Sequence, residues 1–381
     1  KTFNIGIGLN QLANFNRQLS FDGRSVGTIV DRFEEQANGS GFSDFESGLA
    51  FDAFALYDAD GDGFFESDFT GFPDALIQKE QTVLEEGSIN ELVFSIAGNY
   101  NEKLMVGATL GLPFLSFTQQ KTYEEVDPFS DANPDGDIPF FDELTYTEDL
   151  QTTGVGINLK LGAIYRLSQA IRLGAAVHTP TAYNLEDNFT TSFRYVYLDN
   201  DEDGNPVVND NTANSPDGLF DYKYNTPWRF IGSAGFIFGK NGFVSADVEY
   251  VNYGGSNFNL TSDSDNPEDA AFEEELNGQI TDQFQSALNV RVGGELALNI
   301  FRLRGGVGLL GAPEEFSDTN FLYNYSLGAG FRFQNFFLDG AYTLQQADNT
   351  YVPYFTTDAP QQAVSTTTFD SRFLLTLGFK F

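Results

Sequence analysis

The sequence has little or none of several residue types, and each shortage excludes a class of chemistry. It contains no Cys, so disulfides, thiolate metal sites and cysteine nucleophiles are excluded. Its single His, His178, excludes a multi-histidine metal site. Basic residues number 20 against 55 acidic ones, and the net charge of −35 argues against a nucleic-acid partner. No apolar run reaches the roughly 18–20 residues of a membrane helix, which leaves strands as a way to cross a membrane.

Alternation of apolar and polar residues is the dominant pattern. From residue 155 to 167 every second side chain is Val, Ile, Leu, Ala or Tyr, and those between are mostly Gly, Asn, Lys and Arg. Residues 288–298 repeat this pattern. Strict alternation is typical of strands that have one apolar face and one polar or small face.

Strand spacing and charge predict an all-β fold: an antiparallel up-and-down transmembrane β-barrel, formed by residues 1–381 as one domain. Connections alternate between tight and long, and the long ones hold 49 of the 55 acidic residues but six of the 20 basic ones. Short turns at one end and long loops at the other are typical of outer-membrane barrels. Twelve strands are expected, at about 1–12, 89–100, 103–118, 148–167, 170–182 (with a continuation to 198), 222–239, 243–258, 283–298, 302–311, 321–333, 336–347 and 370–381. The long connections are 13–88, 119–149, 183–221, 261–282, 312–320 and 348–370.

A soluble β-sandwich would also alternate, but three features favour the membrane barrel. The apolar face is rich in aromatic residues, loop length alternates by end, and the last strand is amphipathic and finishes at Phe381. Such a terminal aromatic residue is the kind of signal that barrel-assembly machinery reads.

The first long connection differs from the others, because residues 13–88 contain helical spacing. Apolar residues recur every three or four positions within 29–37 and 42–56, and Pro73 precedes a third helical pattern over 74–84. We therefore predict a helical insertion on the extracellular side. It either caps the barrel mouth or forms a ligand groove.

Three segments resemble the outer-membrane long-chain fatty-acid and hydrocarbon transporter family, the FadL-type barrels. They are His178-Thr-Pro-Thr-Ala-Tyr183, Asn225-Thr-Pro-Trp-Arg229 and the strand from Phe243 to Tyr253. The resemblance implies a multi-pass barrel in the cell outer membrane, with fourteen strands when complete and an N-terminal hatch marked by Asn-Pro-Ala. No Asn-Pro-Ala occurs here, so we expect the hatch and the first two strands to precede Lys1.

The resemblance also implies a function: passive uptake of long-chain fatty acids or hydrocarbons, with lateral exit into the bilayer. The exit would lie at a kinked strand, and Gly6 and Gly8 leave the inner face of the first strand bare. Expected partners are membrane lipids, lipopolysaccharide and the hydrophobic substrate. An alternative from another class is a structural barrel subunit of an outer-membrane secretion or assembly complex, which would bind other subunits.

Charged residues of inward parity suggest a binding role. Lys160, Arg229 and Arg291 are our candidates to receive a fatty-acid carboxylate by charge-assisted hydrogen bonds. The alternative is an internal ladder of ion pairs that fills the barrel. An enzyme is not expected, because His178 is the only histidine and has no second His to act with it.

No cofactor is required by this interpretation, but two acidic loops have the spacing of calcium sites. Alternate carboxylates can converge on one hard cation, and a Gly after the third allows a sharp turn. The alternative is that these loops are merely solvated. The candidate ligands are Asp199, Asp201, Asp203 and Asp210 in one loop, and Asp58, Asp60, Asp62 and Glu66 in the other.

Overall fold

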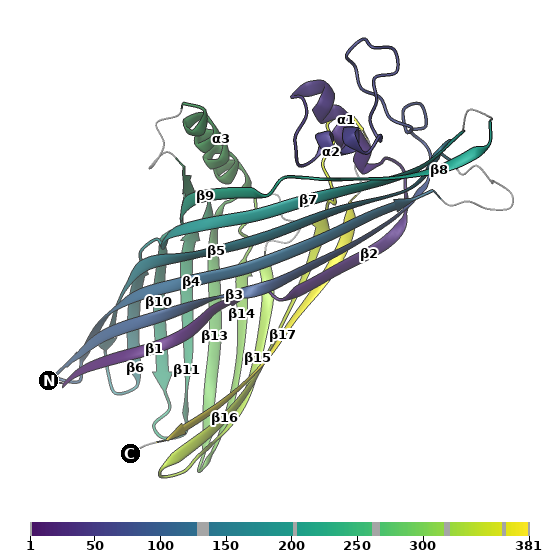
Figure 1. Ribbon diagram of the computed structural model, residues 1–381. Helices are drawn as coiled ribbons and strands as arrows, with labels where there is room; N and C mark the ends of the chain where they lie inside the picture. Colours follow the sequence, from purple (N-terminus) through teal and green to yellow (C-terminus); the bar gives the residue numbers. More distant parts are fainter. Residues whose placement is uncertain are drawn as a thin grey trace.

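The computed structural model describes residues 2–127, 137–200, 204–260, 267–315, 321–359 and 363–379. These residues form one large antiparallel sheet, curved into a barrel, with three α-helices at one end (Figure 1). No described helix is both long and apolar enough to span a membrane. The strands are β1 (Thr2–Asn14), β2 (Arg17–Ser25), β3 (Ile77–Tyr100), β4 (Leu104–Val126), β5 (Phe141–Arg166), β6 (Ile171–His178), β7 (Ala182–Asn200), β8 (Pro206–Asn214), β9 (Gly218–Asn225), β10 (Arg229–Ile237), β11 (Gly242–Asn252), β12 (Asn257–Asn259), β13 (Ser286–Leu298), β14 (Phe301–Gly311), β15 (Phe321–Arg332), β16 (Phe336–Tyr351) and β17 (Val364–Phe379). The helices are α1 (Ile29–Gly39), α2 (Ser47–Asp52), α3 (Pro267–Gln283) and a 3-10 turn η1 (Tyr253–Gly255).

Several strands continue one another across short interruptions, so the described residues make twelve crossings of the barrel. β1 and β2 both pair with β3, and β6 and β7 both pair with β5. In the same way β8, β9 and β10 form one crossing, and β11 and β12 form another. Each remaining strand is a crossing of its own. This confirms the all-β barrel of twelve strands predicted from the alternation.

The two ends of the barrel differ as expected. At the short-turn end Asn101, Glu102 and Asn299 have positive φ angles of 52°, 54° and 55°, which tight hairpin turns require. The long connections and the helices gather at the other end, which we call the long-loop end (Figure 1).

β3, β4 and β5 are far longer than a membrane requires. They contain 24, 23 and 26 residues, whereas a spanning strand needs about 9–11. Their outer halves project past the rest of the barrel at the long-loop end and, together with β7 and β8, carry α1 and α2 (Figure 1). Beside them the first crossing breaks at Phe15 and Asn16, opposite Gly87, whose φ is 129°. A Cβ there would lie 2.1 Å from the Ser116 carbonyl oxygen, so only glycine fits this break.

Local pattern misled the prediction in four places. The helix expected over 74–84 is wrong, because β3 begins at Ile77 and pairs with both β2 and β4. Cross-strand pairing overrides the local helical spacing there. Residues 17–25 and 206–214, expected in loops, form β2 and β8. The connection at 261–282 contains α3, which the sequence pattern did not indicate.

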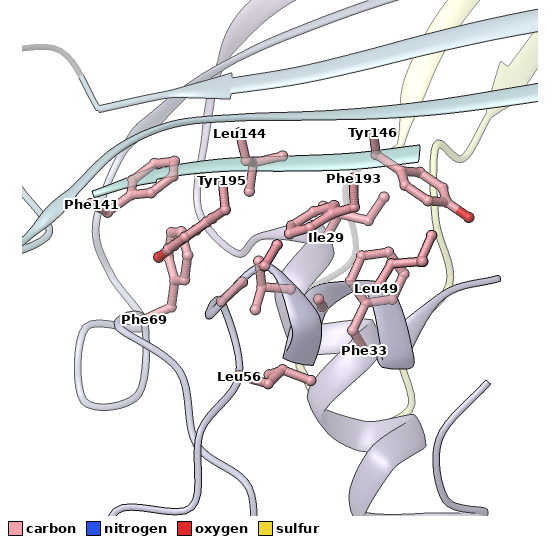
Figure 2. Packing of buried hydrophobic residues seen from close by; sticks show 14 of the residues in the cluster. Ile29, Phe33, Leu49, Leu56, Phe69, Phe141, Leu144, Tyr146, Phe193 and Tyr195 are labelled. Carbon is pink, nitrogen blue, oxygen red and sulfur yellow. The ribbon is translucent and has the colours of Figure 1, made fainter. Parts of the chain in front are cut away.

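The helical insertion packs on the inner side of the projecting wall. Phe33 of α1 is fully buried and makes edge-to-face contacts with Tyr146 and Phe193, at ring-centroid distances of 5.3 and 5.6 Å (Figure 2). Leu49 and Leu56 belong to the same buried cluster. This cluster is a conventional hydrophobic core, and it fixes α1 and α2 against the wall.

A buried carboxylate holds the start of α1. Glu125 on β4 is 0% exposed. It accepts hydrogen bonds from the Thr28 hydroxyl, the Ile29 N–H and the Tyr123 hydroxyl. Thr28 is the N-cap of α1 and forms a capping box with Asp31. Glu125 therefore binds the unsatisfied donors of the helix N-terminus.

Candidate functional site

The outer face of the barrel wall is apolar and uncovered. On β1 the side chains of Phe3, Ile5, Ile7 and Leu9 are 67–73% exposed. Comparable exposed side chains continue around the sheet, among them Leu161, Phe230, Leu327, Phe373 and Leu377. A continuous apolar band of this kind is unfavourable in water and favourable in a bilayer.

Charged side chains line the inner face at mid-height, and we call this group the central belt. Lys160 and Arg229 flank His178 in the strand register, on β5, β6 and β10. Glu91 and Glu249 are the acidic members. The belt consists of Glu91, Lys160, His178, Arg229, Glu249 and Arg291.

The carboxylates of the belt are buried and the cations are not. Glu91 pairs with Lys160, and its side chain is 0% exposed. Glu249 accepts from Arg291 at 3.0 Å and lies 3.8 Å from Arg229. Its side chain is 6% exposed, whereas those of Arg229 and Arg291 are 47% and 49% exposed. Three cations thus lie beside these two carboxylates, and Asp247, the register partner of Arg291, is a third carboxylate on the same inner face.

A glycine makes the first of these pairs possible. Gly111 on β4 lies between Glu91 and Asn158. The side-chain amide of Asn158 donates a hydrogen bond to the Glu91 carboxylate at 2.9 Å. A Cβ at residue 111 would come within 2.3 Å of that carboxylate. Glu91 was missed by the sequence analysis, although it is the only charged residue in 89–100.

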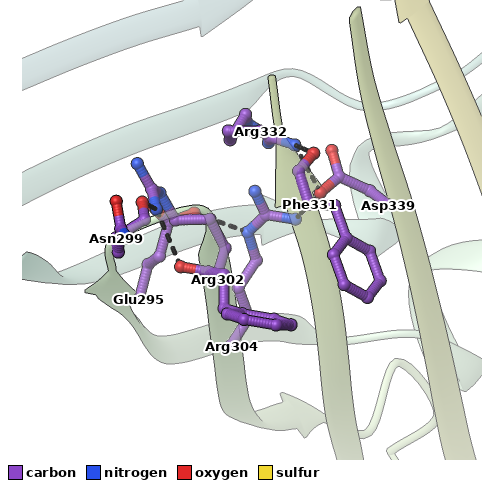
Figure 3. Close-up of polar contacts among 8 residues, drawn as sticks. Glu295, Asn299, Arg302, Arg304, Phe331, Arg332 and Asp339 are labelled. Atoms are coloured by element: carbon purple, nitrogen blue, oxygen red, sulfur yellow. Dashed lines mark hydrogen bonds and ion pairs between the residues drawn. The ribbon is translucent and has the colours of Figure 1, made fainter.

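A second inner group, the short-turn cluster, lies nearer the short-turn end. Arg304 donates to Glu295 at 2.7 Å and to Asp339 at 3.0 Å, so it bridges the two carboxylates (Figure 3). Arg302 and Arg332 complete the cluster. Again three cations share two carboxylates. Both groups show the ion-pair ladder that was the alternative to ligand binding.

Three cavities lie between the helical insertion and the inner face of the sheet. The mouth cavity, about 420 Å³, lies between α1, the projecting wall and residues 351–355. The seam cavity, about 1360 Å³, lies between the first crossing and β17, two edges of the sheet that no ladder joins among the described residues. These two share the lining residues Arg17, Leu19, Glu85, Tyr351 and Phe355.

The third cavity, the floor pocket, has a volume of about 540 Å³ and continues toward the short-turn end. Its lining comes mainly from the inner faces of β11 and β13–β16, and includes Arg291 and Arg304. Asn324 of the floor pocket is the register partner of Gln345 in the seam cavity. The linings of the three cavities therefore reach from the helical insertion to both charged groups.

The two glycines that were predicted to mark an opening in the wall lie in a regular part of the β1–β3 ladder. Gly6 and Gly8 pair with Ser95 and Val93 of β3. The register shifts farther along, between Gln11 and Ala13, before the break at residues 15–16. The irregular part of this crossing is therefore nearer the long-loop end than the two glycines are.

The structure gathers one of the two predicted calcium loops. Acceptor atoms of Asp58, Asp60 and Asp62 lie within 4.8 Å of one another. Asp58 also accepts from the Gly61 and Gly63 N–H groups, at 2.8 and 3.0 Å. Glu66 lies at a backbone bridge with Tyr57.

The other predicted loop has a different arrangement. Asp199 and Asp210 lie on the antiparallel strands β7 and β8, and Arg194 binds the Asp210 carboxylate at 2.8 and 2.9 Å. Asp201 and Asp203 lie outside the described residues. Calcium binding stays a prediction for both loops.

Comparison with solved structures shows the fold. The toluene transporter TodX of Pseudomonas putida matches with a TM-score of 0.50 and 12% identity, over 80% of this chain and 79% of that one. A Pseudomonas aeruginosa FadL homologue gives 0.48 and 14%, over 79% and 74%. The Ralstonia pickettii toluene transporter TbuX gives 0.46 and 14%, over 80% and 78%. No protein-family model and no curated protein sequence matches the chain. The chain therefore has the FadL-type barrel fold, as its sequence motifs suggested.

Proposed function

We propose that this chain takes up hydrophobic molecules by passive diffusion across the outer membrane. The observation that carries the proposal is the set of three cavities, whose linings reach from the helical insertion into the barrel interior. The exposed apolar wall supports a bilayer location, where lipid and lipopolysaccharide would surround it. The barrel fold shared with TodX agrees with this function.

We infer that the preferred substrates are long-chain fatty acids or hydrocarbons. A fatty acid would place its carboxylate on the central belt, where the side chains of Arg229 and Arg291 are 47% and 49% exposed. Charge-assisted hydrogen bonds from Arg are strong and can be bidentate. A hydrocarbon would use the cavities without the belt.

Substitution of the belt arginines tests this substrate class. Arg229→Gln with Arg291→Gln should slow uptake of palmitate and leave uptake of toluene unchanged. Arg372→Gln is a matched control, because Arg372 also has inward parity but pairs with Asp370 outside the belt. Equal uptake of palmitate by the belt variant and the wild type would refute the role of the belt while leaving hydrocarbon uptake open.

We also propose that the substrate leaves sideways into the bilayer next to β1. Crossing water costs about 0.8 kcal/mol per exposed methylene, which is on the order of 10 kcal/mol for a sixteen-carbon chain. A lateral exit would avoid this cost. The bare inner face at Gly6 and Gly8, and the irregular ladder beyond them, support a weak point in this part of the wall.

The exit is tested by filling that face. A Cβ on Gly6 would meet its nearest atom at 3.8 Å and one on Gly8 at 3.3 Å, so Gly6→Leu with Gly8→Leu should still assemble. We expect slower uptake of both substrate types. Gly235→Leu is the control, since Gly235 has the inward parity of Arg229 on β10 and a Cβ there would meet its nearest atom at 3.9 Å. Normal uptake by the double variant would exclude an exit at this site.

The chain is proposed not to be an enzyme, because His178 is its only histidine and the residues that face it in the strand register are Lys160 and Arg229, neither of which is a nucleophile for a His-assisted reaction. A structural subunit of a secretion or assembly complex is the second candidate. It is favoured by exposed aromatic side chains on the helical insertion, such as Phe54 and Phe64. A transporter should be stable alone after purification, whereas a subunit should co-purify with its partners.

A further inference from the structure

The helical insertion has a second apolar face, which is exposed and separate from the buried cluster. The rings of Phe42, Phe51 and Phe65 contact one another at centroid distances of 5.0, 4.7 and 5.7 Å. Phe42 is 46% exposed and Phe51 is 42% exposed, unlike Phe33 of the buried cluster at 0%. We call the three rings, together with the neighbouring exposed side chains of Phe54 and Phe64, the aromatic patch.

Phe54 is unfavourable in this position for two separate reasons. It follows the C-cap of α2 with a φ of 66°, in the left-handed region that strongly favours glycine at helix ends. Its side chain is also 60% exposed, so it gains little from burial. Neither helix termination nor core packing explains a phenylalanine here. Strained residues that persist without such a reason are found mainly at functional surfaces.

The bilayer cannot cover this patch in the way that it covers the wall. α2 and residues 54–65 belong to the insertion, which sits on the projecting halves of β3–β5 beyond the rest of the barrel (Figure 1). The patch is therefore an apolar surface in water, and such surfaces mark sites of interaction.

The charge around the patch defines its partner. Between Arg32 and Lys79 the sequence has eleven acidic residues and no basic one. Asp58, Asp60 and Asp62 gather their carboxylates in the loop between Phe54 and Phe64. Such a border repels anionic lipid and favours cations, which can also lie over the faces of aromatic rings.

We propose that the aromatic patch docks a basic amphipathic segment of a partner protein. Apolar side chains of the segment would cover Phe42, Phe51 and Phe54, and its Lys or Arg side chains would face the acidic border. This recognition resembles the binding of an amphipathic helix to an apolar groove. The proposal does not depend on uptake, and either can fail without the other.

The test uses the full chain in lipid nanodiscs and two synthetic helical peptides. One is built from Leu and Lys, and the other has Glu in place of every Lys. The Lys peptide should bind, and the Glu peptide should not. Phe42→Ser with Phe51→Ser should weaken binding of the Lys peptide by roughly tenfold or more. Phe272→Ser on α3 is the control, because Phe272 is a 47% exposed aromatic residue on another acidic element at the same end.

Phe54→Gly separates docking from a structural role. Glycine suits a φ of 66°, so this variant should protect the insertion from protease better than the wild type while binding the Lys peptide more weakly. Uptake should not change. Three results would overturn the proposal: unchanged binding in the patch variants, an equal loss in the Phe272→Ser control, or a preference of the patch for toluene or anionic vesicles over the Lys peptide.

Discussion

Large apolar side chains are exposed in two regions of this molecule, and the two exposures have different meanings. On the barrel wall, Ile5 and Leu377 are 73% and 57% exposed in a regular ladder with ordinary strand geometry. On the helical insertion, Phe54 is 60% exposed in a strained backbone conformation. The wall side chains repeat every second residue around the sheet, whereas those of the insertion form one local group.

This difference shows that the exposure of an apolar side chain can be interpreted only when the surrounding solvent, water or lipid, is known. The wall requires a hydrocarbon environment, because its apolar band is continuous. The insertion is held by a conventional core and a buried carboxylate, as a soluble domain would be. One chain therefore contains parts built for two solvents, and substitutions should separate them.

The largest expected effect is on the attachment of the insertion. Glu125→Ala would remove three hydrogen bonds and leave the Thr28, Ile29 and Tyr123 donors buried without an acceptor. We expect the free energy of local unfolding of the insertion to fall by about 3–5 kcal/mol. Hydrogen exchange should show loss of protection in 28–56, with β13–β16 unchanged. Glu124→Ala is the control, and equal loss in both variants would mean that Glu125 does not hold the insertion.

A charge placed on each surface tests the contrast in solvent. Leu161→Arg, on the outer face of β5, should lower the free energy of unfolding in lipid vesicles by about 2–4 kcal/mol, because the guanidinium would enter the bilayer. Phe64→Arg on the insertion should change it by less than about 0.5 kcal/mol. Denaturant titration in vesicles measures both. Similar costs at the two positions would contradict the assignment of the wall to lipid.

The wall could be predicted from sequence, and the insertion only in part. Strands such as β13 and β14 were located within a few residues, because alternation depends on local pattern alone. The docking of α1 could not be predicted, since Glu125 and Ile29 are 96 positions apart. The candidate site divides in the same way. Strand alternation predicted that Arg291 faces the interior, whereas the role of Glu91 could be recognised only once the pairing of the strands was known.

A smaller effect concerns pH and the insertion. Burial raises the pKa of Asp31 to about 6, against the opposing hydrogen bond from the Thr28 N–H. Burial also raises the pKa of Glu34 and of Asp68. Carboxyl groups with raised pKa values favour the folded state when protonated, so their stabilising contribution is lost as pH rises through the folded pKa.

The insertion should therefore resist protease better at pH 5 than at pH 7.5. The pKa of Glu35 shifts in the opposite direction. Burial acts to raise this pKa, but hydrogen bonds from three N–H groups of residues 357–359 lower it overall. The stabilising contribution of Glu35 is lost only when the pH falls below the ordinary pKa range of a glutamate, which lies outside the interval from pH 5 to pH 7.5. Asp31→Asn, which mimics the protonated form, should reduce the pH dependence. Greater protection at pH 7.5 would contradict the assignment.

The smallest expected effect is that of calcium. If Asp58, Asp60 and Asp62 bind the ion, chelation should loosen residues 57–66 and lower stability by about 1 kcal/mol, the value for a ligand at a few times its Kd. Asp60→Asn should abolish the response to chelator. Asp199→Asn makes the same comparison for the other predicted loop. Hydrogen exchange that is identical with and without calcium would exclude both sites.

The surplus of cations on the inner face has an electrical consequence. The long connections carry a net charge of −43 and the strands carry +8, so the sign of the fixed charge reverses along the barrel axis. An aqueous path through such a gradient would act as a rectifier, because an ion of either sign meets a repelling region at one end. Any residual conductance in a planar bilayer should depend on the polarity of the applied voltage, and the part of the path that the strands line should prefer anions although the whole chain is strongly acidic.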